Sequence, residues 1–251
     1  MKVQIITPTI GSEDLIDALL SVHHQVSDMD LEIKHMVVVD GAEFQEVVDA
    51  RIVEAEKQGY SRKNLQVMTL PYNTGGKGFY GHKIYAAATQ LLLPDVDYVL
   101  FLDQDNWYEP NHVDSVVRAA VLGGLDFSFS LRKFYTWDGN FHSNDNCASL
   151  GPWKIWEDGG HNLVDTGCYC FKREFIERRG HLWNMGWGVD INFFESVMAT
   201  AIYQTTGERT FCYRLGRPDA AKYEEEMKFI EDNNKLAAEK YGGDYPWERV
   251  N

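Results

Sequence analysis

The chain has 251 residues, 44% of them hydrophobic, and a formal net charge of −14 from 24 basic and 38 acidic residues. This length suits one domain with a substantial core, so we expect a single domain over residues 1–251. The acidic balance disfavours an extended nucleic-acid footprint, because proteins that bind the phosphate backbone usually carry a basic face. No apolar run approaches the length needed to cross a bilayer and the start lacks a secretory signal, so we expect a cytoplasmic protein without a membrane span.

The first half of the chain alternates between apolar runs and helical patterns. Strands are predicted over residues 3–8, 33–40, 65–71 and 97–103. Helices are predicted after Ser12 and over residues 42–59 and 82–93. This alternation favours an α/β fold with parallel strands, right-handed crossovers and helices on both faces of the sheet. Ligands of such sheets bind beyond the carboxyl ends of the strands, where Pro8, Asp40, Asn73 and Asp103 stand.

The pattern changes after about residue 125. Residues 126–141 alternate like a strand or hairpin, and a loop-rich stretch follows to about residue 160. Residues 166–175 return to a strand pattern. A final helix, predicted from Pro218 onward, carries one apolar stripe and acidic residues elsewhere, which is typical of a helix packed on one face.

Two aspartates, Asp103 and Asp105, follow the fourth predicted strand in "VLFLDQDNWYEP". In extended geometry residues two apart point the same way, so two hard oxygen ligands could meet one divalent cation there. The same acids would also suit a polar strand end that leads to a helix N-terminus near Pro110, where negative charge is favourable.

The segment 73–81, "NTGGKGFYG", is rich in glycine and precedes a predicted helix. Glycine permits close approach of the backbone to a ligand, and Lys77 or Lys83 would offset the charge of a diphosphate. The alternative is a flexible turn before a helix.

Bulky aromatic residues and two glycines surround Asp190 in "WNMGWGVDINFFES", residues 183–196. A carboxylate in a partly apolar pocket can have its pKa raised towards neutrality and act as a general base, with Glu195 as the reserve candidate. Asp190 would equally suit a capping or first-turn position of a helix. The aromatic faces of Trp153 and Trp187 suit a carbohydrate acceptor.

Several of these features come in one fixed order. They are "ITPTIGS" at the end of the first strand, "VVVDGAE" at the end of the second, "NTGGKGFYGHKIYAAA", and "FLDQDNWYEP". Together they resemble the nucleotide-binding half of a GT-A glycosyltransferase, most like the inverting family 2 enzymes. The resemblance covers residues 3–125 and, more loosely, 160–195, where the segment around Asp190 is similar to the family's W-G-x-E-D, with Val189 in place of the glutamate.

The resemblance implies a Rossmann-like GT-A sheet whose nucleotide-sugar-binding half spans about residues 1–125. The acceptor-binding half and the C-terminal helix would then span about residues 126–251. On the donor side, Thr7 and Pro8 would line the nucleotide pocket and Asp40 would contact the base or ribose. Asp103 would lie near the ribose and the metal, and Asp105 would bind the metal.

The implied reaction is a metal-dependent, inverting transfer of a hexosyl group from a nucleotide-diphosphate sugar, with a UDP-sugar as the expected donor. Asp190 would deprotonate the hydroxyl of a carbohydrate or other acceptor, and Mn²⁺ or Mg²⁺ would be the cofactor. Many GT-A enzymes use a downstream histidine as a third metal ligand, for which His142, His161 and His181 are the candidates; the alternative, which the sequence favours, is that each is a surface or hydrogen-bonded residue. The alternatives are a sugar-1-phosphate nucleotidyltransferase, a non-catalytic nucleotide- or sugar-binding module on the same fold, and a doubly wound protein with an unrelated ligand.

Overall fold

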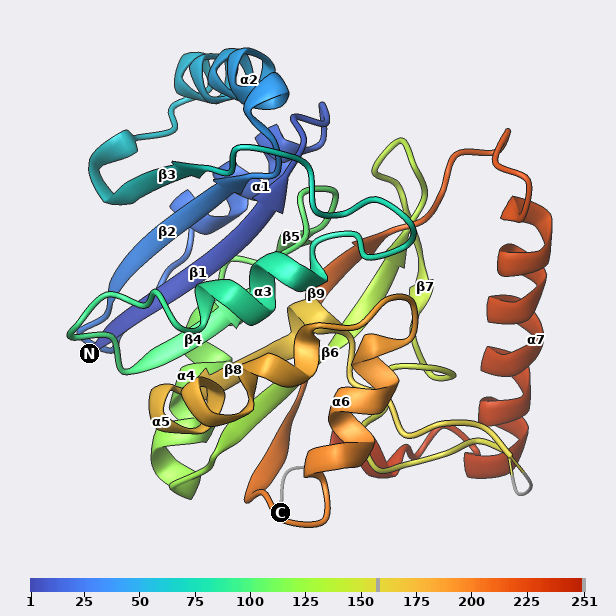
Figure 1. The fold of residues 1–251 in the computed structure, drawn as a ribbon. Helices are drawn as coiled ribbons and strands as arrows, with labels where there is room; N and C mark the ends of the chain where they lie inside the picture. Colours follow the sequence, from blue (N-terminus) through green and yellow to red (C-terminus); the bar gives the residue numbers. More distant parts are fainter. Residues whose placement is uncertain (157–158, 250–251) are drawn as a thin grey trace.

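The structure is a computed structural model that describes residues 1–156 and 159–249. A nine-stranded mixed sheet runs through these residues (Figure 1). Its strands are β1 (Lys2–Thr9), β2 (Glu32–Val39), β3 (Leu65–Thr69), β4 (Tyr98–Phe101), β5 (Trp107–Tyr108), β6 (Phe127–Tyr135), β7 (Phe141–Asn144), β8 (Tyr169–Lys172) and β9 (Tyr203–Arg214). Their order is β3-β2-β1-β4-β8-β6-β9-β5, and β7 pairs with β6.

The first four strands are neighbours and parallel, as the alternation of strands and helices predicted. The strand β8 is antiparallel to both β4 and β6, whereas β6 and β9 are parallel to each other. Because an antiparallel strand starts where its neighbour ends, the loop before β8 lies at the same edge as the carboxyl end of β4. Segments from both halves of the chain therefore meet at this edge.

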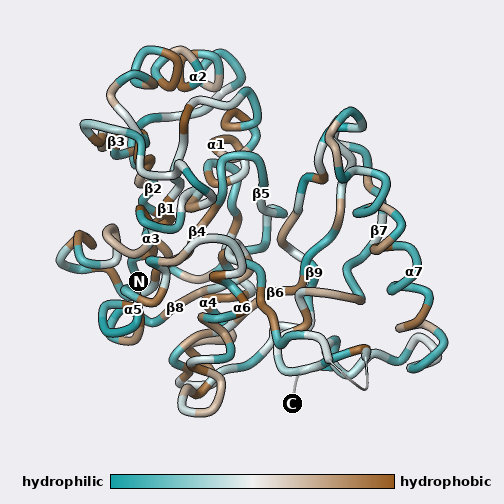
Figure 2. Tube along the Cα trace, turned by 45° about the vertical axis from the view of Figure 1, so that its right-hand side comes forward, coloured by the Kyte–Doolittle hydropathy of each residue, from teal (hydrophilic) through white to brown (hydrophobic). Residues whose placement is uncertain are grey.

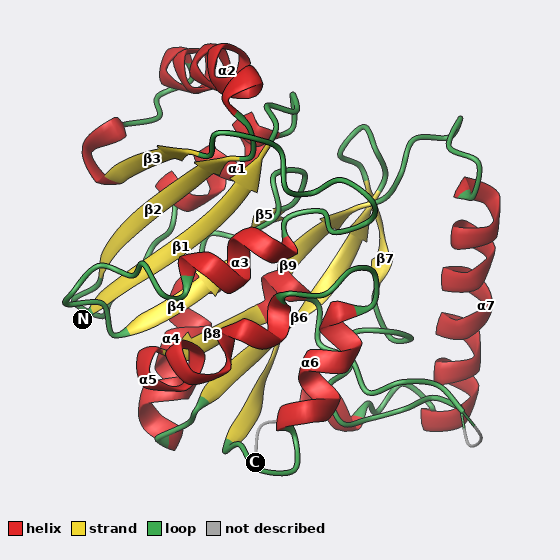
Figure 3. Cartoon of the chain, in the orientation of Figure 1, coloured by secondary structure: helices red, strands yellow, loops and turns green. Residues whose placement is uncertain are grey.

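Helices cover both faces of the sheet. They are α1 (Leu15–His23), α2 (Gln45–Lys57), α3 (His82–Ala88), α4 (His112–Gly123), α5 (Arg173–Arg179), α6 (Val189–Val197) and α7 (Tyr223–Tyr241). Short 3₁₀ helices are η1 (Ala42–Phe44), η2 (Arg62–Asn64), η3 (Thr166–Cys168), η4 (Gly180–Trp183) and η5 (Pro246–Glu248). In Figure 3, α3 and α6 lie in front of the sheet and α1 and α4 behind it. Among the described residues, no helix combines the length and the apolar character that a membrane crossing requires.

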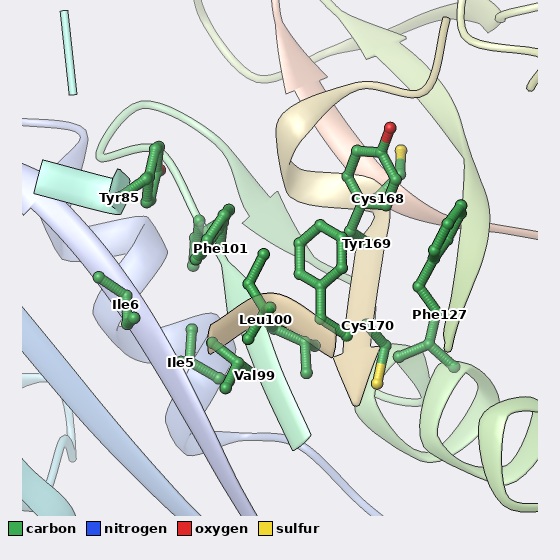
Figure 4. Packing of buried hydrophobic residues seen from close by; sticks show 14 of the residues in the cluster. Ile5, Ile6, Tyr85, Val99, Leu100, Phe101, Phe127, Cys168, Tyr169 and Cys170 are labelled. Atoms are coloured by element: carbon green, nitrogen blue, oxygen red, sulfur yellow. The ribbon is translucent and has the colours of Figure 1, made fainter. Parts of the chain in front are cut away.

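The strand β1 shows why the central sheet forms. It lies between β2 and β4, and seven of its eight residues are buried, which is why its sequence is an apolar run rather than an alternation. Ile5 and Ile6 pair in register with Leu100 and Phe101 of β4, and Figure 4 shows these side chains in the core. The ring of Tyr85 from α3 stacks on Phe101 with 4.3 Å between the ring centroids. This packing fixes α3 above the end of β4.

A second core cluster lies beneath α7, at the other end of the sheet from β3 (Figure 1). Ile230 and Ala237 of α7 are buried there against Leu131, Phe134 and other apolar residues. The rest of α7 is hydrophilic along most of its length (Figure 2). The helix is therefore packed on one face, as its apolar stripe predicted, although it begins at Tyr223 instead of at Pro218.

Several boundaries differ from the predictions. The helix α1 begins at Leu15 instead of directly after Ser12, and α3 ends at Ala88 instead of at residue 93. The strand predicted over residues 166–175 is only β8, because η3 precedes it and α5 begins at Arg173. The strands β5 and β9 were not predicted.

Candidate active site

A pocket of about 780 Å³ opens at the edge of the sheet where β1, β2 and β4 end. Six residues predicted from the sequence line it, namely Pro8, Asp40, Asp103, Asp105, Trp187 and Asp190. The first four come from the parallel half of the sheet, and the last two come from the start of α6. The fold thus brings the two predicted groups of residues to one cavity.

Asp103 and Asp105 are held by neighbouring elements. The hydroxyl of Tyr85 donates a hydrogen bond of 2.8 Å to Oδ1 of Asp103. The side chain of Arg214, at the end of β9, donates from Nε to the backbone oxygen of Asp105 at 3.2 Å, and its backbone N–H donates to Oδ1 of Asn106 at 2.9 Å. Two elements distant in sequence therefore fix the segment that carries both aspartates.

Gln104, which stands between the two aspartates, fixes the loop after β1. Its Oε1 accepts hydrogen bonds from Oγ1 of Thr9 at 2.7 Å, from the backbone N–H of Ile10 at 3.1 Å and from that of Ser12 at 3.3 Å. The ends of β1 and β4 are consequently tied together at the floor of the pocket.

Negative charge is concentrated around Asp103. Burial raises its pKa to about 8, with further increases from the charges of Asp105, Asp165 and Asp190, while the hydrogen bond from Tyr85 acts in the opposite direction. A cation beside this group would relieve the repulsion.

The donor set suits a divalent cation that keeps other ligands. Across residues 1–156 and 159–249, no group of three His, Cys, Asp or Glu side chains is arranged to hold a metal ion. Mg²⁺ and similar ions are commonly bound by one or two carboxylates together with substrate phosphates and water. Asp103 and Asp105 fit that kind of site, in which the protein supplies only part of the coordination shell.

Asp40 is buried, and its carboxylate holds the start of the glycine-rich loop. Oδ1 accepts hydrogen bonds from the backbone N–H and the hydroxyl of Thr74, at 2.7 and 2.8 Å, and Oδ2 accepts from the N–H of Gly75 at 2.9 Å. A Cβ atom at Gly75 would lie 2.4 Å from the backbone oxygen of Tyr80, so only glycine fits this turn. Asp40 thus shapes the loop as well as lining the pocket.

Four other predicted site residues do not line the pocket. Oγ1 of Thr7 lies 2.9 Å from Nε2 of His35 inside the sheet. The ammonium of Lys83 stands over the ring of Phe79, 3.8 Å from its centroid. The remaining two are Lys77, which adopts a left-handed backbone conformation in the glycine-rich loop, and Trp153, which packs against the core. Their binding roles stay predictions.

Asp190 lies in the first turn of α6, where its Oδ1 accepts a hydrogen bond of 2.9 Å from the N–H of Ile191. It is therefore a first-turn acid, and it also lines the pocket. Burial, followed by the charge of Asp165, raises its pKa. Nearby Trp187 is 82% exposed. The site thus offers a carboxylate with raised proton affinity beside an open aromatic face.

The reserve base and the three candidate histidines lie outside the pocket wall. Glu195 accepts a hydrogen bond from the backbone N–H of Asn162 at 3.2 Å, and Nδ1 of His161 lies 3.7 Å from its Oε1. His142 contacts the neighbouring Ser143, and His181 is exposed in η4. None of these three histidines lines the pocket that holds the two aspartates.

The sequence analysis missed residues that the second half of the sheet adds to the pocket, notably Arg132 of β6, Asp165 before η3, and Tyr213 and Arg214 of β9. A lone arginine in the apolar strand pattern of "FSFSLRKFY" and a lone aspartate before "TGCYCF" were the available signals. Charged residues in buried strands are costly unless they are paired, so their presence points to a partner.

Comparisons with known proteins agree with this geometry. A family model described as glycosyl transferase family 2 matches residues 4–184. The structure of S. aureus TarS 1-349 in complex with UDP is 17% identical, with a TM-score of 0.61, and the match covers 98% of this chain and 68% of that one. The mannosyltransferase PcManGT from Pyrobaculum calidifontis, in complex with GDP-Man and Mn²⁺, is 14% identical, with a TM-score of 0.60.

The match with the mannosyltransferase covers 99% of this chain and 65% of that one, so this chain spans a little less than two thirds of its length. No curated protein matches. The structural matches show a shared fold, and the family model covers well over half of the chain. The protein therefore belongs to glycosyl transferase family 2 and is a glycosyltransferase of the GT-A fold.

Proposed function

We propose that the protein is a metal-dependent, inverting glycosyltransferase that moves a sugar from a UDP-sugar to an acceptor hydroxyl. The observation that carries the proposal is the single pocket that Asp103, Asp105 and Asp190 line together. Support for the donor class comes from the fold, since structures of TarS contain UDP and UDP-GlcNAc and the structure of the mannosyltransferase contains GDP-Man. GDP-sugars are therefore the second donor class to test.

In this proposal the diphosphate of the donor lies beside Asp103 and Asp105. A divalent cation bound there would act as a Lewis acid that stabilises the charge of the leaving diphosphate. Tyr85 and Arg214 hold the segment of the two aspartates in place before the donor arrives. Such preorganisation lowers the cost of binding a charged group.

Asp190 takes the proton of the acceptor hydroxyl. The acceptor oxygen then forms a bond to the anomeric carbon, while the bond from that carbon to the diphosphate oxygen breaks and the electron pair leaves with the diphosphate. Because the acceptor attacks opposite to the leaving group, the anomeric configuration inverts. The raised pKa of Asp190 suits this role, because a base of higher pKa accepts the proton more readily.

We further propose that residues 1–125 form the nucleotide-sugar-binding half and that residues 126–251 form the acceptor-binding half. The exposed ring of Trp187 is the aromatic face we assign to the acceptor, since apolar sugar faces pack on such rings. Trp153 is the less favourable of the two predicted aromatics, because it packs against the core.

The proposal is tested first by thermal stabilisation with UDP, GDP, CMP and ADP, each with and without Mn²⁺. A ligand that binds only the folded state raises its stability, so the correct diphosphate should raise the melting temperature, and more so with Mn²⁺. With the donor sugar found in this way, NMR of the first product reports whether the anomeric configuration is inverted. Absence of stabilisation by every nucleotide would contradict the proposal. Consumption of a nucleoside triphosphate with release of pyrophosphate would favour nucleotidyl transfer instead.

A further inference from the structure

A buried ion network forms part of the pocket wall. Arg132 and Asp165 both line the pocket, although their side chains are only 10% and 9% exposed. Nη1 of Arg132 donates to Oδ2 of Asp165 at 2.5 Å, and Nε donates to Oδ2 of Asp145, also at 2.5 Å. The guanidinium stands over the ring of Phe134 and over that of Tyr213, 4.7 and 4.8 Å from their centroids. The arginine is therefore held rigidly.

The two aspartates of this network face different surroundings. Asp145 is completely buried, does not line the pocket, and binds three backbone N–H groups, those of Cys147, Ala148 and Ser149. Asp165 lines the pocket, and among the described residues its one other side-chain bond is from the N–H of Gly167 to Oδ1 at 3.1 Å. Only the Asp165 side of the network thus opens on the pocket.

The network has hydrogen-bonding capacity left over. Within the described part of the chain, Nη2 of Arg132 makes no hydrogen bond. It is also not one of the fully enclosed polar atoms without a partner, so it is not sealed inside the core. An ionised carboxylate has room for about four hydrogen bonds, and Asp165 receives two. Buried ion networks contribute little to stability by themselves, so free donors and acceptors on a pocket wall suggest a ligand.

Asp165 lines the same pocket as Asp103 and Asp190, the two reacting ends of the proposed site. It precedes η3, which packs against both β4 and β6, and it is close enough to act electrostatically on both Asp103 and Asp190. In the proposed reaction the diphosphate lies at Asp103 and the acceptor hydroxyl lies at Asp190. The sugar that is transferred must occupy the space between these groups.

We propose that Asp165 and Arg132 form the subsite that recognises two adjacent hydroxyl groups of the transferred sugar. One hydroxyl donates to the carboxylate of Asp165, and its neighbour accepts from Nη2 of Arg132. This arrangement selects the configuration at both carbons, because the donor and the acceptor are fixed in space. The ion network carries a net negative charge and Asp103 and Asp190 are nearby, so the subsite favours a neutral hexose over a uronic acid.

This inference rests on the proposed function, and binding measurements separate the two. Isothermal titration calorimetry with Mn²⁺ compares UDP with UDP-glucose, UDP-galactose and UDP-GlcNAc, and GDP with GDP-mannose. The increment in affinity that the best sugar adds to its bare diphosphate measures the sugar subsite alone. Asp165→Asn should reduce this increment by about tenfold or more, the loss expected for hydrogen bonds to a charged group, and should narrow the differences between sugars. Affinity for the bare diphosphate should stay unchanged.

Asp145→Asn is the matched control, because it removes the same charge from the same arginine on the side away from the pocket. It should reduce the sugar increment less than Asp165→Asn does, because the carboxylate on the pocket side remains. Arg132→Lys is the second variant, which keeps the charge but loses the planar fork and should also reduce the increment. Binding of the bare diphosphate shows in each case that the site is folded.

The outcomes are distinct. If the wild-type protein binds none of the diphosphates, the proposed function fails. If it binds a diphosphate but the sugar adds no affinity, or if Asp165→Asn retains the whole increment and the same preference among sugars, the subsite is overturned while the proposed function stands.

Discussion

Asp105 is exposed at the pocket, so its side chain contributes little to folding and its replacement tests the metal role cleanly. We predict that Asp105→Asn abolishes metal-dependent sugar transfer. Its free energy of unfolding should not fall, because the substitution removes a charge that repels Asp103. Transfer assays across a Mn²⁺ series and urea denaturation measure the two effects.

The control is Asp232→Asn, which removes an exposed aspartate from α7 and should retain full activity. Mn²⁺-dependent transfer by Asp105→Asn at the wild-type rate would refute the role.

Asp190 provides a prediction about pH. A general base works only when it is deprotonated, and burial and Asp165 raise the pKa of Asp190 above its ordinary value of 3.8. We predict that kcat/KM falls as the pH decreases through this raised pKa, so the acidic limb of the profile should have its midpoint above pH 3.8. Asp190→Asn should lower kcat by at least about a hundredfold, since general base catalysis commonly contributes that much.

The control for this prediction is Glu195→Gln, because Glu195 lies on the same helix but outside the pocket wall. This variant should keep both the rate and the acidic limb of the wild-type protein. If Glu195→Gln loses activity while Asp190→Asn stays active, the general base is Glu195 and not Asp190.

At the scale of elements, β9 carries the side chain that fastens the Asp105 segment. Arg214 bonds the backbone oxygens of Asp105 and Trp137 and pairs with Asp14 and Asp17 of the first helical region. We predict that Arg214→Lys raises the Mn²⁺ concentration needed for half-maximal activity several-fold. A lysine ammonium cannot bond both backbone oxygens and both carboxylates at once, as the planar guanidinium does. At saturating Mn²⁺ most of kcat should return.

Arg217 offers the matched control for the β9 prediction. Its guanidinium stands over the ring of Trp137, 5.4 Å from the centroid, but it does not line the pocket. Arg217→Lys should leave the Mn²⁺ dependence unchanged. An unchanged Mn²⁺ requirement in Arg214→Lys would show that β9 does not position the metal-binding segment.

The same strand shows where sequence analysis reaches its limit. The parallel strands were predictable because each is a short apolar run followed by a turn, and the residues after β1, β2 and β4 could be assigned to one edge. In β9, by contrast, Gly207 adopts a left-handed conformation and charged Glu208 and Arg209 follow it. The register with β6 shifts beside this point, so the apolar residues do not keep a period of two. The pocket residues of β9 were therefore hidden together with the strand.

Long-range pairs were equally unpredictable. Arg132, Asp145 and Asp165 were visible as single residues, but nothing in their spacing shows that one arginine joins both carboxylates. The positions of residues at the carboxyl ends of the parallel strands were easier to predict, because all parallel strands end at the same edge of the sheet. Thr7 shows the limit of that rule, since consecutive residues of a strand point to opposite faces and its side chain turns towards His35.

For the molecule as a whole, stability should depend on pH through two buried histidines. Burial lowers the pKa of His35 in β2 and of His112 in α4 to about 3, from the ordinary value of 6.5. Each bonds a threonine hydroxyl, His35 to Thr7 at 2.9 Å and His112 to Thr210 at 2.8 Å. Both side chains therefore stay neutral in the folded protein at pH values where the unfolded chain takes up protons.

The sign of the effect follows from this difference. The contribution of each histidine is fully present above about pH 6.5 and is lost as the pH falls from there towards 3, by up to about 1.4 kcal/mol per pH unit. The raised pKa of Asp103 acts in the opposite direction, because the folded protein then takes up a proton that the unfolded chain does not.

Single variants isolate the contribution of each histidine. His35→Gln should be less stable than wild type at pH 7.5, yet its free energy of unfolding should fall less steeply below pH 6.5. Urea denaturation at pH 7.5, 6.5 and 5.5 measures the slopes, and parallel curves for the two proteins would show that His35 takes up its proton in the folded state.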